Sequence, residues 1–183
     1  MPQVAPTMYV WRVSCHLRAA AVALVACFCL TAADWPRFRG PNGAGSSDAK
    51  GLPVKFSRHK NVAWKRSVPA GKSSPVIVGE RIFLTAHEDD KRIVLCLDRE
   101  SGAELWRRHV IAERTEPRHP LNDPASPTPV SDGANVYAFF SEFGLAAYGP
   151  DAELLWRALL GPFEISQGVG ASPILADGKD RHI

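Results

Sequence analysis

The amino-acid sequence predicts an all-β protein, a β-propeller with four-stranded blades, of which this chain holds about two and the start of a third. Short runs of residues rich in β-branched and aromatic side chains alternate with turn residues. The order of the runs repeats: Pro75, Pro129 and Pro173 open three copies at intervals of 54 and 44 residues, and Trp106 and Trp156 close two of them. Such repeats are typical of propeller blades; a four-stranded sandwich repeat or a solenoid, whose repeats are usually shorter, is the alternative.

Residues 1–33 have the pattern of a signal peptide. Arg12 and Arg18 precede an apolar run at 19–30, and small residues follow it. The run is shorter than the ~20 residues that a membrane-spanning helix needs, so no transmembrane span is expected. Cleavage after Ala33 would release an exported chain, periplasmic or extracellular.

Two other interpretations of this leader stay open. Residues 24–27, LVAC, resemble a bacterial lipobox, which would leave Cys27 as the lipid-modified N-terminus of an anchored outer-membrane lipoprotein. The leader could instead be a buried N-terminal helix. N-terminal processing distinguishes all three.

Composition and charge exclude several classes of partner. The chain is 45 % hydrophobic and 22 % charged, which is typical of a globular protein. Its formal net charge is +3, and without the leader 20 basic and 19 acidic residues remain. A nearly neutral chain gives no reason to expect nucleic acid or an anionic membrane surface as a partner.

The predicted elements follow in chain order. Residues 34–61 are rich in Gly, Pro and Ser, show no period and form an extended lead-in segment. Blade 1 spans about 62–110, and blade 2 about 125–160 after a Pro-rich, charged connection. The start of blade 3 lies at about 171–183. The runs expected as strands are 61–68, 74–78, 81–87, 92–98 and 104–110 in the first copy, then 126–130, 135–140, 144–148 and 153–159 in the second.

The run 92–98 is apolar on both sides. Ile93, Leu95 and Leu97 alternate with Val94 and Cys96. A strand with apolar residues on both sides is covered on both faces, as in stacked sheets. Only Cys96 remains outside the leader, so no disulfide framework or CxxC metal pair is expected, and we interpret Cys96 as a small buried hydrophobe.

The end of the first copy predicts how blades join. Asp98 to Gly102 form a polar turn in which Gly102 can take positive φ, and the outermost strand begins at Glu104. Trp106 then projects between adjacent sheets, where its large face packs and its indole N–H needs a partner.

Written out, Cys96-x-Asp98-x-x-Ser101-Gly102-x-x-x-Trp106 resembles the tryptophan-docking motif of pyrroloquinoline quinone (PQQ)-type propellers, Ala-x-Asp-x-x-Thr-Gly-x-x-x-Trp. The second copy keeps Trp156 but lacks the Asp and the Thr-Gly turn. The lead-in DWPRFRGPNGAG and the later segments ASPTPVSDG and GPFEISQGVGASPIL look like secreted PQQ-like propeller proteins of planctomycete-type bacteria. The resemblance implies a fold related to quinoprotein dehydrogenases and to an outer-membrane assembly lipoprotein, and it implies that this chain is an N-terminal fragment.

Other candidate sites are weaker. The run His87 to Asp90 contains possible metal ligands, but it lacks calcium-loop spacing and suits a charged hairpin. Gly40 to Gly45 is Gly-rich without the Lys-Ser/Thr of a phosphate loop, so we expect a turn. His119, Asn122 and Asp123 lie in the connection between blades, where binding residues gather.

Three functional hypotheses follow. The first is an exported, non-catalytic propeller that acts as a binding or assembly scaffold for a protein or polysaccharide, without a cofactor. The second is a fragment of a PQQ-dependent alcohol or sugar dehydrogenase, which the resemblance links to PQQ and calcium. The third is a carbohydrate-binding or hydrolase-associated module. No catalytic or metal-ligating residue is assigned, and fold alone does not choose among them.

Overall fold

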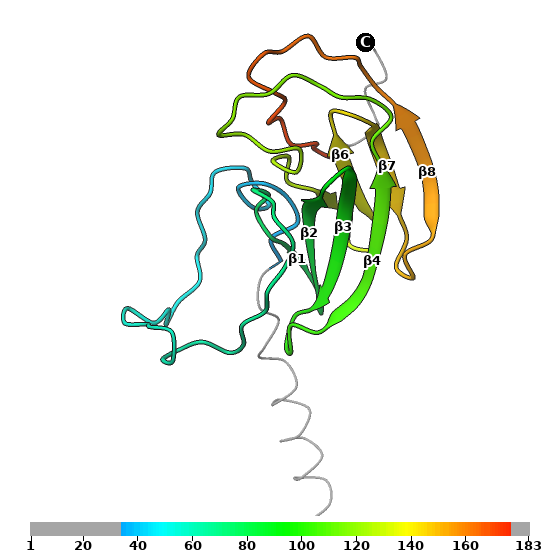
Figure 1. Cartoon of the computed structure of the whole chain (residues 1–183). Coiled ribbons are helices and arrows are strands. Elements are labelled where there is room, and N and C mark those ends of the chain that lie inside the picture. Colours follow the sequence, from blue (N-terminus) through cyan, green and yellow to red (C-terminus); the bar gives the residue numbers. More distant parts are fainter. Residues whose placement is uncertain (1–33, 177–183) are drawn as a thin grey trace, which may run out of the picture. The chain divides into compact units, whose positions relative to one another are not determined.

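The computed structural model describes residues 34–176, which contain eight strands in two four-stranded antiparallel sheets (Figure 1). The all-β class with four-stranded units, about two of them, is confirmed. The predicted leader and Cys27 lie outside the described residues. Sheet 1 consists of β1 (Val76–Val78), β2 (Arg81–Glu88), β3 (Lys91–Asp98) and β4 (Glu104–Ile111). Sheet 2 consists of β5 (Val130–Ser131), β6 (Val136–Phe140), β7 (Gly144–Tyr148) and β8 (Leu154–Leu159).

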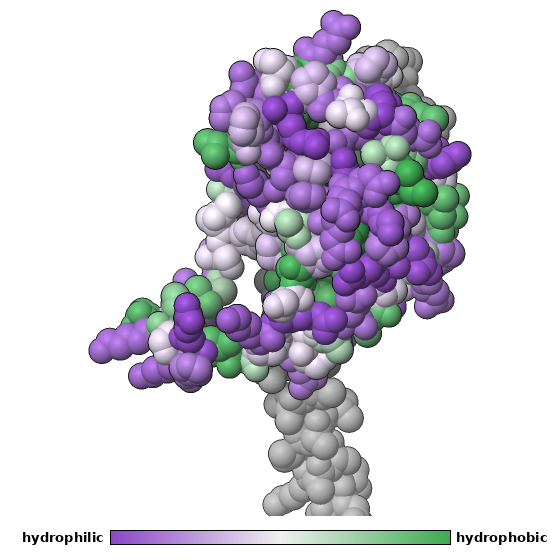
Figure 2. All heavy atoms as spheres, viewed as in Figure 1, coloured by the Kyte–Doolittle hydropathy of each residue, from purple (hydrophilic) through white to green (hydrophobic). Residues whose placement is uncertain are grey.

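Each sheet is an up-and-down meander in which every strand pairs with the next one in the chain. Tight turns make this possible. Gly79 and Asp89 take φ of 54° and 51° between β1 and β2 and between β2 and β3, in the left-handed region that short hairpin turns require. The surface in Figure 2 is mainly hydrophilic, with separate hydrophobic areas. Within the part of the chain that the structure describes, no helix is long and apolar enough to cross a membrane.

The outermost strands of both sheets carry a bulge at the same place. In sheet 1 the register shifts between Cys96 and Leu97, so that Trp106 lies opposite Cys96. In sheet 2 it shifts between Ala147 and Tyr148, so that Trp156 lies opposite Ala147. A bulge adds one residue to a strand and bends it, which re-aims the side chains beside it. The two tryptophans therefore occupy equivalent positions in the two sheets.

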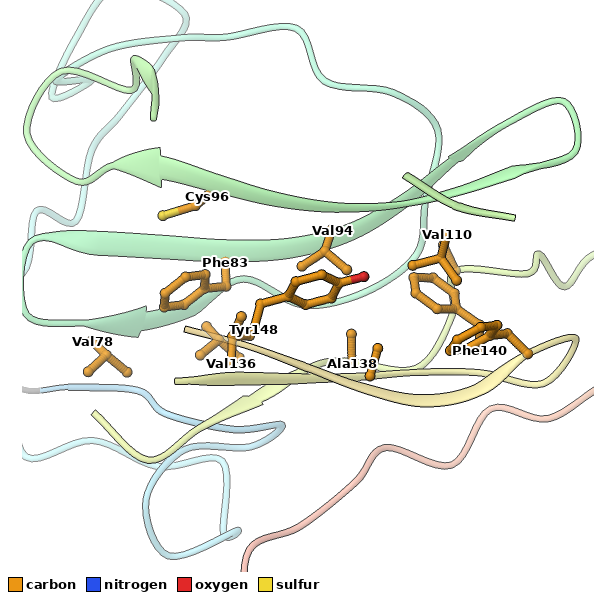
Figure 3. Packing of buried hydrophobic residues seen from close by; sticks show 13 residues of the cluster. Val78, Phe83, Val94, Cys96, Val110, Val136, Ala138, Phe140 and Tyr148 are labelled. Carbon is orange, nitrogen blue, oxygen red and sulfur yellow. The ribbon is translucent and has the colours of Figure 1, made fainter. Parts of the chain in front are cut away.

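The main core lies between the sheets (Figure 3). The alternating residues of each strand that face the other sheet form it: Phe83, Val94, Cys96 and Val110 from sheet 1, and Val136, Ala138, Phe140, Ala146 and Tyr148 from sheet 2. The opposite face of β3 contributes to a second cluster with Ala86, Ile93 and Leu95. The prediction that 92–98 is covered on both faces is confirmed, because Ile93 to Cys96 are all 0 % exposed.

The lead-in is attached to both sheets through its first residues. Trp35 pairs with Ile77, exchanging two backbone hydrogen bonds of 2.7 and 3.0 Å, and so extends sheet 1 at the β1 edge. The Pro36 carbonyl accepts a hydrogen bond from the Ser131 amide of sheet 2 (2.9 Å). Gly40, at φ 79°, closes a turn against the Trp35 ring, where a Cβ atom would lie 2.8 Å from ring carbons. These residues therefore hold the edges of β1 and β5 together.

Two expected strands do not form in the described residues. Sheet 1 begins at Val76 rather than at about residue 62, because 61–68 has no neighbouring strand with which to form a ladder. Residues 171–176, the expected opening of a third copy, also form no strand. Residues 177–183 lie outside the described range, so the third blade stays a prediction.

Candidate functional site

The turn Asp98–Gly102 is closed by its own side chains. Asp98 Oδ1 accepts hydrogen bonds from the Ser101 hydroxyl and from the Ser101 amide, the latter at 2.8 Å. The hydroxyl and amide bonds from Ser101 are the main reasons why the pKa of Asp98 is lowered. The Gly102 amide donates to the Asp98 carbonyl (2.9 Å), and Gly102 has φ 70°. The Asp, Ser and Gly of the motif thus build one rigid turn.

This turn holds Trp64, a residue that sequence reasoning did not single out. The Trp64 indole nitrogen donates to the Arg99 carbonyl (2.9 Å), and its ring covers Gly102 so closely that a Cβ there would lie 2.5 Å from a ring carbon. The segment 61–68, which precedes sheet 1 and forms no strand, is therefore docked on sheet 1 by a tryptophan. A signal for it exists in the sequence, because Trp64 precedes Trp106 by 42 residues, about one repeat.

Trp106 lies between the two sheets. Its ring is tilted against Phe83 of sheet 1 and against Tyr148 of sheet 2, with centroid distances of 5.9 and 6.3 Å. Its indole nitrogen is buried and has no hydrogen-bond partner among residues 34–176. Two strand positions later, the Arg108 guanidinium donates to the Ala152 carbonyl of the next turn (2.7 Å). Trp106 contributes aromatic packing to the contact between the sheets, without the hydrogen bond that Trp64 makes.

Trp156 occupies in sheet 2 the position that Trp106 occupies in sheet 1, but its side chain is exposed. It is tilted against Tyr137 with a centroid distance of 6.0 Å, as Trp106 is against Phe83, yet it is 46 % exposed. Neighbouring side chains of β8 are also exposed, and Figure 2 shows hydrophobic surface at the side where β8 lies in Figure 1. Trp156 and Tyr137 both lie opposite Ala147, on the side of sheet 2 that faces away from sheet 1, and we name this side the β8 face. Leu154 and Leu159 are exposed on the other side of β8, where they lie opposite Tyr148 and Gly144.

One hydrogen bond is repeated from copy to copy. The Ser74 amide donates to the Thr128 hydroxyl (3.0 Å), and the Thr128 amide donates to the Ser172 hydroxyl (3.0 Å). Each of these residues directly precedes the proline that opens a copy. The opening of the third copy is therefore joined to the second in the same way as the second is joined to the first.

His119, Asn122 and Asp123 share one loop, where most of their polar atoms are used locally. His119 Nδ1 accepts from the Leu121 amide (3.1 Å) and Asp123 Oδ1 accepts from the Ala125 amide (2.9 Å). The Asn122 side chain donates to the Gln167 carbonyl (2.9 Å). These bonds shape the loop and connect it to 160–168, and a binding role for the three residues stays a prediction.

A buried ion pair joins the ends of the sheets beside this loop. Arg92 of β3 donates two hydrogen bonds of 2.9 Å to the Glu142 carboxylate, which also contacts the Arg118 guanidinium. Arg92 is 4 % exposed and Glu142 is 1 % exposed. Burial alone would raise the pKa of Glu142, but the hydrogen bonds and charges of both arginines outweigh it and lower the pKa. No local sequence pattern indicates this pair, because its partners are 50 residues apart.

The other candidate residues lie in a turn, in an ion pair or in the core. Asp89 and Asp90 form the turn between β2 and β3, and Glu88 lies 3.7 Å from the Arg107 guanidinium. Within residues 34–176 no three His, Cys, Asp or Glu side chains lie close enough together to hold a metal ion. Cys96 is fully buried, as expected, and burial raises the pKa of its thiol to about 11, so it is protonated at neutral pH.

Comparison with known proteins gives a single coarse result. No protein-family model and no curated protein matches this chain. Among the solved structures that match is BamB from Moraxella catarrhalis, with a TM-score of 0.41 and 16 % sequence identity. The match covers 55 % of this chain and 32 % of that one, so this chain spans about a third of the length of the BamB chain that it matches.

Proposed function

We propose that this chain is an exported, non-catalytic scaffold of the propeller type, and that its β8 face binds a β-sheet of another protein. The observation that carries the proposal is the equivalence of Trp106 and Trp156. Sheet 1 packs on sheet 2 through the face that bears Trp106, and sheet 2 presents the corresponding face, with Trp156 leaning on Tyr137 at nearly the same distance. Exposed apolar surface of this kind marks a protein interaction site.

The proposed partner is a β-sheet in which the turn before the outermost strand leaves room for the Trp156 side chain. Sheet 1 has such a turn at Gly102, but Trp64 of the same chain already occupies it. The Gly102 turn of a second, unaltered copy of this chain is therefore already filled. The partner is a sheet of the same repeat type with a small residue at this turn. Because the binding place for Trp156 is a turn of a β-sheet, the proposal favours a protein over a polysaccharide.

A dehydrogenase function is less well supported by the residues present. The resemblance links PQQ and calcium to a pair of adjacent cysteines and to carboxylate ligands. In residues 34–176 Cys96 is the single cysteine and is buried, and the acidic side chains there do not converge into a metal-binding group. This donor set does not fit the quinone and its ion, so we derive no chemistry from them.

Removal of Trp64 tests the docking proposal. In Trp64→Ala the turn at Gly102 is free, so we expect full-length chains to associate head to tail, with Trp156 of one copy at Gly102 of the next. The double variant Trp64→Ala/Trp156→Ala and the unaltered chain should both be monomeric. Sedimentation velocity measures these states, and a monomeric Trp64→Ala chain would contradict the proposal.

Export is supported by the sequence pattern of residues 12–33. N-terminal sequencing of the protein recovered outside the cytoplasm should begin at Asp34. A lipid-modified Cys27 would replace simple export by membrane anchoring, and an intact Met1 would contradict both.

A further inference from the structure

Residues 46–63 form an arm that stands away from the two sheets. Figure 1 shows the arm, in blue to cyan, as a long loop beside the strands. Every residue of the arm is exposed. Hydrogen bonds close its tip, since Ser57 and Lys60 exchange two backbone bonds (3.2 and 3.3 Å) and the Asn61 side chain donates to the Lys55 carbonyl (2.7 Å). Among the described residues, no hydrogen bond joins the arm to either sheet.

Three large apolar side chains of the arm are exposed. Leu52, Val54 and Phe56 are 67 %, 93 % and 71 % exposed, and they lie within five consecutive positions. A spacing of two residues lets all three point to the same side where the segment is extended. Figure 2 shows the arm as a projection on which hydrophobic and hydrophilic residues lie side by side. Exposed apolar residues that are contiguous, unlike single ones, mark a place that another surface covers.

The arm belongs to a basic part of the chain. Residues 49–79 contain seven Lys and Arg and no Asp or Glu, a net charge of +7, whereas residues 80–176 contain nine basic and fifteen acidic residues, a net charge of −6. The nearly neutral total charge of the chain therefore conceals this basic part. The basic residues within the arm form no ion pair with any carboxylate among residues 34–176: Lys50, Lys55, Arg58 and Lys60.

Exposed apolar side chains among unpaired basic ones are typical of segments that lie in the interface of a membrane. Basic side chains are attracted by anionic lipid headgroups, and apolar side chains enter the boundary between headgroups and acyl chains. A soluble polyanion would bind the charges but leave the apolar side chains in water. An apolar protein surface would cover these side chains but leave the basic groups without a partner. A surface that is both anionic and apolar suits the arm best.

We propose that the arm binds the surface of an anionic phospholipid bilayer. Leu52, Val54 and Phe56 enter the interface, and the four basic residues of the arm contact the phosphate groups. The arm shares no residue with the β8 face, so the failure of either proposal leaves the other standing.

Cosedimentation with vesicles measures this binding. The vesicles contain about 30 % phosphatidylglycerol in phosphatidylcholine, and vesicles of phosphatidylcholine alone are compared with them. The full chain is used, together with the form that begins at Asp34, which lacks the apolar run of the leader but retains both sheets and their core. Both forms should bind the anionic vesicles more tightly than the neutral ones. Salt at about 0.5 M should weaken the binding, because it screens the charges.

Substitutions in the arm assign the binding to its side chains. Lys55→Gln should lower the partition coefficient of the Asp34 form on anionic vesicles about fivefold, which is the contribution of one basic residue near such a surface. Phe56→Ser should lower it about 10-fold, because an apolar side chain no longer enters the interface. Lys91→Gln and Leu121→Ser are the matched controls, at exposed positions outside the arm, and should leave it unchanged.

Tryptophan fluorescence distinguishes insertion from attraction by charge alone. The emission of Phe56→Trp should shift to shorter wavelength on anionic vesicles, whereas that of Leu121→Trp should not shift. The proposal is overturned if the Asp34 form does not bind anionic vesicles, or if the emission of Phe56→Trp stays unchanged on them. It is also overturned if Phe56→Ser binds as the unaltered chain does, since the arm would then act as a ligand for any polyanion.

Discussion

Trp64 covers Gly102, and no other residue type would fit beneath its ring at that position. The glycine has φ 70°, and a Cβ atom would lie 2.5 Å from the Trp64 ring. Trp64, Trp106 and Trp156 follow one another at intervals of 42 and 50 residues. Trp64 is docked on a turn and hydrogen-bonded, Trp106 lies between the two sheets, and Trp156 is exposed. The segment 61–68 thus contributes a tryptophan of the same series as those of the two sheets.

The Gly102 contact predicts a steric effect that a glycine elsewhere does not show. Gly102→Ala combines positive φ with a collision, whereas Gly79→Ala has similar backbone strain (φ 54°) but open space around it. Gly79→Ala should cost about 1 kcal/mol of unfolding free energy. Gly102→Ala should cost at least about 1 kcal/mol more, because the Trp64 ring must move. Chemical denaturation measures both, and equal costs would show that Trp64 does not rest on this turn.

Trp106 and Trp156 should differ strongly in their contribution to stability, although their positions in the sheets are equivalent. Trp106→Ala leaves a cavity between Phe83 and Tyr148 and should cost about 3 kcal/mol of unfolding free energy. Trp156→Ala, at a residue 46 % exposed, should cost less than about 1 kcal/mol. Because the Trp106 indole nitrogen has no partner among the described residues, Trp106→Phe should recover most of the loss. Thermal and urea unfolding give these values; a small cost for Trp106→Ala would refute the packing role.

The buried ion pair should matter more than an exposed one. Arg92→Ala leaves the Glu142 carboxylate buried with only the partly exposed Arg118, so we expect a loss of about 3 kcal/mol. Arg66→Ala removes one of the two arginines that pair with Glu104 at the surface and should cost less than about 1 kcal/mol. Urea denaturation of the two variants compares them. Similar small losses would mean that water reaches the Glu142 carboxylate.

Acid should destabilise the protein through Asp132. Burial alone would raise the pKa of Asp132, but hydrogen bonds from the Asn135 amide and the Tyr137 hydroxyl outweigh it and lower the pKa to about 2. The unfolded chain has a pKa of about 3.9, so this contribution to stability is complete above about pH 4 and is lost as the pH falls toward 2. Asp132→Asn should flatten the fall of unfolding free energy across this window, and Tyr137→Phe should flatten it in part. A slope that Asp132→Asn leaves unchanged would assign the acid sensitivity to other groups.

Local patterns predicted the sheets better than the contacts between them. The alternation in 92–98 and the turn residues at 79–80 and 89–90 are local, and hairpin strands pair with their neighbours, so β2 and β3 follow from the sequence. Residues 61–68 have strand-like composition but no partner strand in the described part, because a ladder depends on a neighbour that composition does not specify. Composition alone therefore gave a strand where the structure has an extended segment.

The long-range contacts could not be predicted from the sequence, for different reasons. Trp64 has no motif of its own, and only its distance from Trp106 relates it to the repeat. The Arg92–Glu142 pair could not be selected among the many charged residues, since nothing near either residue specifies the other. In contrast, the Ser or Thr before each opening proline is visible in the sequence, and its bond from copy to copy explains why these positions are hydroxyl residues.

A mixing experiment measures whether the β8 face and a free Gly102 turn are complementary. The double variant Trp64→Ala/Trp156→Ala has a free turn but no tryptophan on its β8 face, and the unaltered chain has the tryptophan but a filled turn. Neither should associate alone, whereas the mixture should form a 1:1 complex in analytical ultracentrifugation. Complementarity is refuted if the mixture shows no complex, or if a Trp156→Ala chain binds the double variant as well as the unaltered chain does.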